Sequence, residues 1–193
     1  MTQLVIGLIV FLGIHSISIV ARPTRDRLAA RLGEWPFKLV YSVIAAVGLV
    51  LIVIGYGEAR LTPTVLYSPP DWLRHLNMLL MLIVFPGLLA AYLPGRIGDA
   101  LKHPMLVAVK AWALSHLLVN GTLADVLLFG GFLAWAVADR VSMKHRPAGG
   151  SALALPRTRF NDAIVVIGGL VLYVVFSFWL HPAWIGVSVM GSG

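Results

Sequence analysis

Residues 37–56 read FKLVYSVIAAVGLVLIVIGY, an apolar stretch with one charged residue, Lys38. An α-helix needs about 20 predominantly apolar residues to cross the roughly 30 Å hydrocarbon core of a bilayer. This stretch therefore predicts a membrane-spanning helix. The six stretches of this character are residues 4–20, 37–56, 76–93, 104–119, 122–138 and 163–180. The sequence predicts an all-α fold, a polytopic transmembrane helical bundle of about six helices embedded in a lipid bilayer.

The composition of the 193-residue chain excludes an ordinary soluble domain. Hydrophobic residues make up 59% of the chain and charged residues 12%, about half the share found in soluble domains. The formal net charge of +7 is explained by basic cytoplasmic loops, so no nucleic-acid partner is expected. The chain has no cysteine, which excludes disulfides, iron–sulfur clusters, thiolate nucleophiles and covalent haem attachment.

Positive charges are distributed unevenly between the connections that join the predicted spans. Because successive spans reverse direction, the first, third and fifth connections lie on one side of the membrane. The second and fourth hold only Arg60 and Arg74. The first, third and fifth hold Arg22, Arg25, Arg27, Arg31, Lys38, Arg96, Lys102, Arg140, Lys144, Arg146, Arg157 and Arg159. Since basic residues concentrate on the cytoplasmic side, both termini are predicted on the non-cytoplasmic side.

The spans show no internal repeat of the kind found in inverted-repeat transporters, so residues 1–190 are predicted to form a single transmembrane domain. No basic residue precedes residue 4, and arginines follow the first span, which favours an uncleaved first helix over a signal peptide. The longest connection contains Pro147-Ala148-Gly149-Gly150-Ser151, which we interpret as a flexible linker. Gly191-Ser192-Gly193 is interpreted as an appended remnant.

Two histidines, His15 and His116, lie well inside predicted spans, on the first and fourth. A polar group in hydrocarbon is costly unless it has a partner, so both are candidates for function. Neutral imidazole binds iron through one nitrogen while the other donates to a carbonyl or hydroxyl group. A pair on separate helices suits haem b. Each histidine can equally form a hydrogen bond across a helix interface, and both interpretations stay open.

His75 is an alternative ligand, because it lies near the outer end of the third span at about the depth of His116. At about 1.5 Å per residue, His15 lies roughly 16 Å from the outer edge of its span and His116 about 5 Å from the same edge. His103 precedes the fourth span, where an interfacial or capping role is expected.

Two cations are candidate haem-binding residues, Arg22 and Lys110. The i, i+3, i+7 spacing of His15, Ser18 and Arg22 predicts a shared face on the first helix, which would join an iron ligand to a propionate-binding arginine. Arg22 can instead anchor a helix end. Lys110 either extends toward the cytoplasm on its long apolar stem or pairs with a haem propionate or a carboxylate.

Small and acidic residues mark the fifth span. Gly130-Gly131 predicts close helix packing. Asp125 and Asp139 lie near opposite ends of this span, where water can reach them, and proton transfer through them is one interpretation.

Several short motifs resemble the NnrU family of bacterial membrane proteins over about residues 1–180. The opening carries His15-Ser16, Arg22, Leu32-Gly33-Glu34 and Tyr41-Ser42. Later come His103-Pro104-Met105-Leu106, Trp112-Ala113-Leu114-Ser115-His116-Leu117-Leu118, Asn120-Gly121, Leu127-Leu128-Phe129-Gly130-Gly131-Phe132 and Asp139-Arg140. Each motif is weak alone, but the combination is specific.

The resemblance implies a multi-pass protein of the bacterial inner (cytoplasmic) membrane, associated with denitrification and with nitric oxide or nitrite respiration. A more distant relative of that family is the 15-cis-zeta-carotene isomerase, a haem b membrane enzyme. The resemblance implies that His15 and His116 match its haem-ligating histidines and that His103 matches another of its histidines. Ala113 stands where the isomerase carries a cysteine, so a cysteine-based ligand switch is not expected.

Three functions are consistent with these features. The first is a haem b-binding protein with a redox or accessory role in nitric oxide or nitrite metabolism. The second is a haem-dependent cis–trans isomerase of a lipid-soluble polyene such as zeta-carotene. The third is a haem-free membrane assembly or transport factor whose histidines join helices. Whether the protein is an enzyme stays open.

Overall fold

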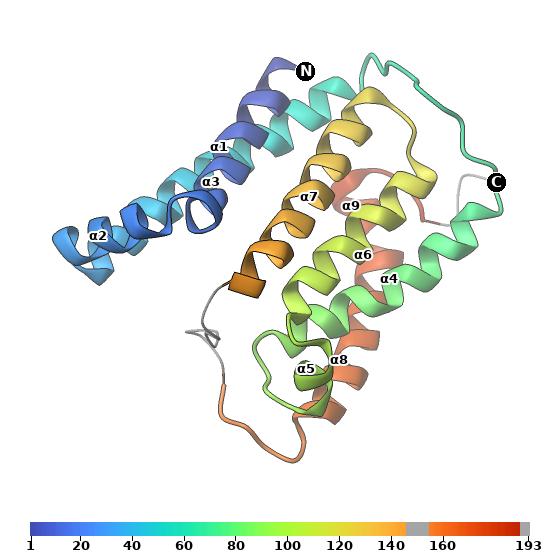
Figure 1. Cartoon of the computed structure of the whole chain (residues 1–193). Helices are drawn as coiled ribbons and strands as arrows, with labels where there is room; N and C mark the ends of the chain where they lie inside the picture. The colour runs from blue at the N-terminus through green and yellow to red at the C-terminus, as the bar shows by residue number, and fades with distance from the viewer. Residues whose placement is uncertain (146–154, 190–193) are drawn as a thin grey trace. The chain divides into compact units, whose positions relative to one another are not determined.

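The computed structural model describes residues 1–145 and 155–189 (Figure 1). The elements are α1 (Thr2–Val20), α2 (Arg22–Leu32), α3 (Glu34–Ala59), α4 (Leu73–Ala90), α5 (Arg96–Leu101), α6 (Pro104–Val119), α7 (Leu123–Ser142), the 3₁₀ turn η1 (Met143–His145), α8 (Asn161–Val175), the π-helical segment η2 (Phe176–Leu180) and α9 (His181–Ile185). These residues contain no β-strand, apart from an isolated bridge between Val65 and Thr122. The all-α prediction is confirmed. The predicted linker at 147–151 and the tail at 191–193 lie outside the described residues.

Four helical segments are long and apolar enough to cross a membrane: α1, α3, α4 and the continuous run Asn161–Ile185. The apolar helix α6 is shorter, at about 24 Å. Helix α7 is long enough but carries Asp125, Asp139 and Arg140. The structure thus confirms an apolar multi-helix protein with at least four candidate spans, and the count of about six stays a prediction.

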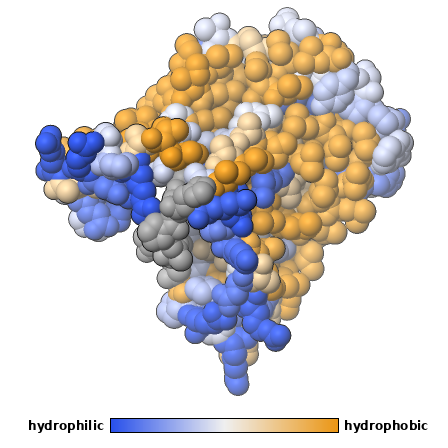
Figure 2. All heavy atoms as spheres, viewed as in Figure 1, coloured by the Kyte–Doolittle hydropathy of each residue, from blue (hydrophilic) through white to orange (hydrophobic). Residues whose placement is uncertain are grey.

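Large apolar side chains point outward from the candidate spans. On α3, Leu39 is 65% exposed and Val53 is 64% exposed. Figure 2 shows apolar residues over most of the face in view, whereas hydrophilic residues gather over α2 and over α5 with the segment that precedes α8. In water such a surface would aggregate, so the exposed side chains fit a hydrocarbon environment.

The helices form two compact units, and each is described by itself. The first unit holds α1, α2, α3 and α7; the second holds α4, α5, α6, α8 and α9. The prediction of a single domain over residues 1–190 stays a prediction.

In the first unit, the backbones of α1 and α3 touch at three glycines. A Cβ atom on Gly7 would lie 2.6 Å from the Ile52 nitrogen, and one on Gly48 would lie 2.7 Å from the Phe11 nitrogen. A Cβ on Gly55 would meet the Leu4 backbone. These contacts run in opposite directions along the two helices, so α1 and α3 are antiparallel, and only glycine fits at these three positions.

The close packing predicted at Gly130-Gly131 stays a prediction. A Cβ on Gly130 would meet nothing within 4 Å, and one on Gly131 would make an ordinary contact with Leu12 at 3.5 Å. Within the first unit, no neighbouring backbone therefore approaches the pair closely.

Helix α1 ends before Arg22, so the predicted shared face of His15, Ser18 and Arg22 is wrong. Ala21 adopts φ −138° and interrupts the helix, and Arg22 begins the separate helix α2. The following Pro23 has no N–H and sits in the first turn of α2, a position that proline favours. An unbroken helix through Pro23 would lose a hydrogen bond and clash with the preceding turn.

In the second unit, α4 packs against both α6 and α8. A Cβ on Gly169 of α8 would lie 2.6 Å from the Pro86 ring, and one on Gly87 would lie 3.1 Å from Ala108 of α6. Nearer the start of α4, the Tyr173 hydroxyl donates to the Met78 carbonyl over 3.3 Å. Helix α4 is therefore antiparallel to α8. Two adjacent residues of α4, Pro86 and Gly87, contact α8 and α6 respectively.

Each unit has one strongly basic end. In the first unit, Phe11 meets Phe132 and His15 meets Trp135, so α1 and α7 run parallel and end at the same level. That end carries the cations of α2 with Lys38, Arg140 and Lys144, whereas the opposite end carries Arg60. In the second unit, the end with α5 carries Arg96, Lys102, Arg157 and Arg159, and the opposite end carries Arg74.

Candidate functional site

His15 is held by its own helix. Its Nδ1 atom lies 2.7 Å from the carbonyl oxygen of Phe11, four residues earlier on α1. A carbonyl oxygen can only accept, so Nδ1 carries the proton and donates. Nε2 therefore keeps a lone pair, and within residues 1–145 and 155–189 it forms no hydrogen bond. The arrangement presents one neutral imidazole nitrogen for a ligand.

Three aromatic rings from three helices surround the His15 imidazole. Phe11 of α1 stacks on it with ring centroids 4.3 Å apart. Tyr41 of α3 and Trp135 of α7 approach edge-on at 5.4 Å and 5.9 Å. The imidazole is half-buried among them, so the rings exclude water from much of its surface.

Trp135 has a buried polar atom without a partner. Its Nε1 is inaccessible to solvent and has no acceptor in the part of the chain that the structure describes. Sequence reasoning identified neither Trp135 nor Phe11 as part of this site. The available signal was the spacing of Phe132 and Trp135, which places both rings on the face of α7 that meets α1.

His116, in the second unit, forms the same kind of hydrogen bond from Nδ1 as His15. Its Nδ1 lies 2.9 Å from the carbonyl oxygen of Trp112, four residues earlier on α6, and the Trp112 ring lies 5.5 Å away. The Ser115 hydroxyl also lies 3.4 Å from Nδ1. Since the Trp112 carbonyl must accept, Nδ1 is again the protonated nitrogen and Nε2 is the candidate ligand atom. Ala113 on the same helix is fully buried.

His75 differs from both. It lies in the first turn of α4, exposed, and its imidazole forms no hydrogen bond with the described residues. Because α4 and α6 are antiparallel, His75 and His116 lie toward the same end of the second unit. Its role as the alternative ligand stays a prediction, without the orienting bond that the other two histidines have.

The two candidate propionate-binding cations lie in different units. The Arg22 side chain is 43% exposed, and its Nε lies 3.8 Å from the Asp26 carboxylate. Lys110 is half-buried in the middle of α6 and forms no hydrogen bond or ion pair with the described residues. Cofactor binding by Arg22 and Lys110 stays a prediction.

His103 precedes α6, where its carbonyl accepts from the Val107 nitrogen over 3.1 Å.

Asp125 has a structural role. It is 5% exposed and forms a capping box with Thr122 at the start of α7. Its Oδ1 accepts from the Tyr56 hydroxyl over 2.6 Å, and its Oδ2 accepts from the Thr122 hydroxyl over 2.6 Å. These bonds join the start of α7 to α3. They engage both oxygens of the carboxylate, and proton transfer through Asp125 stays a prediction.

Within the described ranges, no three histidine or acidic side chains come together as ligands for a metal ion. Iron in a porphyrin requires only one or two protein ligands, because the ring nitrogens supply the others.

Comparison with known proteins assigns the chain to a family. The family described as NnrU protein matches residues 3–189, nearly the whole sequence. No curated protein and no solved structure matches. The matched range includes α1 with His15 and α6 with His116. The chain is a membrane protein that belongs to the NnrU family.

Proposed function

We propose that this protein binds haem b in the bacterial inner (cytoplasmic) membrane and serves nitric oxide or nitrite metabolism in a redox or accessory role. The observation that carries the proposal is a hydrogen bond that the Nδ1 atoms of His15 and His116 both form within their own helix. In both, Nδ1 donates to the carbonyl four residues earlier and Nε2 keeps the lone pair. Iron-ligating histidines commonly have this second hydrogen bond, which fixes the tautomer and increases the basicity of the ligand.

The surrounding residues suit a redox site. If bound, haem would supply a one-electron Fe(III)/Fe(II) couple, and His15 and His116 as its two protein ligands would favour electron transfer over open-site catalysis. Phe11, Tyr41 and Trp135 keep water from His15, and a drier environment is one of the factors that set a redox potential. Arg22 and Lys110 are the cations that we assign to the haem propionates.

The same contacts weaken the haem-free alternative. That function expects the histidines to join helices by hydrogen bonds, but the only hydrogen bond of the His15 ring to a described residue lies within α1. The isomerase alternative has no specific support. Ala113 is buried where the resemblance places a cysteine, so a thiolate cannot replace a histidine at the iron.

The basic ends of the two units support the proposed topology. If both basic ends face the cytoplasm, both termini lie outside and the membrane is crossed six times, by α1, α3, α4, α6, α7 and α8. Helices α6 and α7 then count as spans. Capping by Asp125 at the outer start of α7 keeps its carboxylate hydrogen-bonded near the interface.

The direct test is the optical spectrum of the detergent-purified protein, oxidised and reduced. A Soret band with sharp α and β bands on reduction is expected for two histidine ligands. Protein that lacks this spectrum after incubation with haem b overturns the haem assignment. Failure of a deletion strain to reduce nitric oxide or nitrite would support the metabolic role, whereas turnover of a poly-cis carotenoid would replace it with the isomerase.

A further inference from the structure

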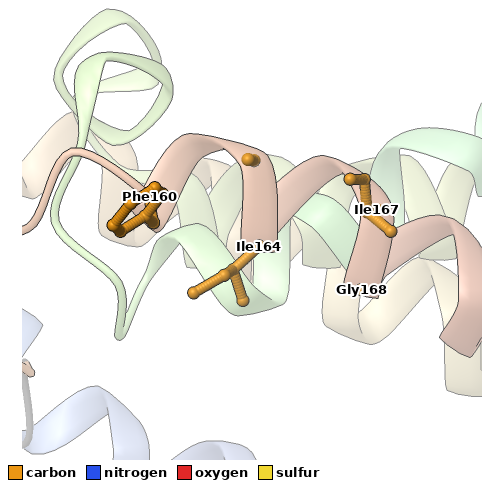
Figure 3. Close-up of a pocket in the computed structure, with 5 residues that line it drawn as sticks. Phe160, Ile164, Ile167 and Gly168 are labelled. Carbon is orange, nitrogen blue, oxygen red and sulfur yellow. The ribbon is translucent and has the colours of Figure 1, made fainter.

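An apolar groove runs along one face of α8. It has a volume of about 370 Å³ and is lined by Phe160, Ala163, Ile164, Ile167 and Gly168 (Figure 3). Their spacing of three and four residues places them in one stripe on the helix. Phe160, Ile164 and Ile167 are 58%, 48% and 65% exposed. The small residues Ala163 and Gly168 leave the hollow between the larger side chains.

A cation, Arg159, lies at the start of the groove. The Arg159 guanidinium lies over the Phe160 ring, 4.7 Å from its centroid. Arg159 forms no ion pair with any described residue. The nearby Asp162 carboxylate accepts instead from the backbone nitrogens of Arg96 and Ile97 at 3.1 Å and 3.0 Å.

Arg157, two residues earlier, is already neutralised. Its guanidinium donates to the Asp99 carboxylate over 2.6 Å, and this pair raises the pKa of Arg157. Of the two arginines that precede α8, Arg159 is therefore the one that has no ion pair with a described residue. The pair also provides a matched control, because both arginines are exposed and lie at the same end of the second unit.

We propose that this groove binds an anionic phospholipid, with an acyl chain along α8 and the phosphate at Arg159. The lining from Phe160 to Gly168 spans about 12 Å along the helix axis, so it can hold the upper part of an acyl chain. The groove is apolar throughout and begins where the candidate span Asn161–Ile185 begins, which is the level of lipid headgroups. The positive charge at its head complements a phosphate.

The test is lipid binding by the full-length detergent-purified protein, measured by native mass spectrometry. The probes are phosphatidylglycerol and phosphatidylcholine with identical acyl chains. The expected result is a preference for phosphatidylglycerol that falls about fivefold in Arg159→Gln and persists in Arg157→Gln and Arg159→Lys. Equal binding of the two lipids, or equal losses in the Arg157→Gln and Arg159→Gln variants, would overturn the proposal.

A second variant tests the groove itself. Ala163 is exposed, so Ala163→Phe fills the hollow without entering the helix interface. Binding of both lipids should fall in this variant, while circular dichroism stays unchanged. Unaltered lipid binding would show that no chain lies in the groove and would overturn the proposal. Competition by inorganic phosphate without any dependence on acyl chains would assign Arg159 to free phosphate and would also overturn it.

Discussion

The Nδ1 atom of His15 donates to the carbonyl oxygen of Phe11 over 2.7 Å, one helical turn earlier on α1. The bond fixes the tautomer and the orientation of the ring, and it leaves the lone pair on Nε2. His116 has the same bond to Trp112 on α6. At His15, this bond lies inside one helix and does not join α1 to a neighbour.

Replacement of either histidine should release the haem. We expect His15→Ala and His116→Ala each to lower haem affinity by at least about tenfold, because each removes an iron ligand. His75→Ala is the control and should retain haem, since its ring lacks the orienting bond. The measurement is the ratio of haem to protein by pyridine haemochrome assay. Haem loss in His75→Ala with retention in His15→Ala would instead identify His75 and His116 as the pair.

Gly55→Ala should destabilise the first unit. The added Cβ would overlap the Leu4 backbone, and separating α1 from α3 should cost about 1–3 kcal/mol. Gly57→Ala, on the same helix, is the matched control. Its Cβ would meet nothing within 4 Å, so the higher helix propensity of alanine should leave stability equal or raise it by up to about 1 kcal/mol. Thermal unfolding in detergent measures both, and equal melting temperatures would contradict the packing described for α1 and α3.

Asp125→Ala should destabilise α7 without removing haem. The change removes the cap of α7 and leaves the Tyr56 hydroxyl without its acceptor, which together cost about 2–4 kcal/mol. The control Asp26→Ala breaks only exposed ion pairs and should cost less than about 1 kcal/mol. Melting temperature and haem content are measured together. Loss of haem at unchanged stability would assign Asp125 a direct role in cofactor binding.

The absence of cysteine allows the topology to be mapped with single cysteines as unique labels. In intact cells, a membrane-impermeant maleimide should label Thr62→Cys and should leave Thr24→Cys and Ala100→Cys unlabelled. All three positions are exposed, so accessibility depends on the side of the membrane. The bridge between Val65 and Thr122 ties the start of α7 to the side of Thr62. Protection of Ala100→Cys therefore implies that α6 crosses, and the reverse labelling pattern would invert the topology.

Several features of the fold followed from the sequence because they depend on composition along the chain. Each of the six predicted apolar spans contains a helix, and the fourth matches α6 residue for residue, at 104–119. Helix α2 was not predicted, because its arginines carry no apolar periodicity and only the proline in its first turn marks its start. The predicted alignment of Arg22 with His15 failed at the same proline.

The sequence by itself determined a helical membrane protein with candidate histidines on two separate helices. Hydrocarbon imposes a length and a polarity on each span, and both can be read from the order of residues. Only the tertiary structure decided that α1 and α3 approach closely at Gly7, Gly48 and Gly55. It also decided that Trp135 packs edge-on against His15. Contacts between helices depend on how each helix is rotated toward its neighbours. In a span that is apolar on every side, the sequence pattern does not fix that rotation.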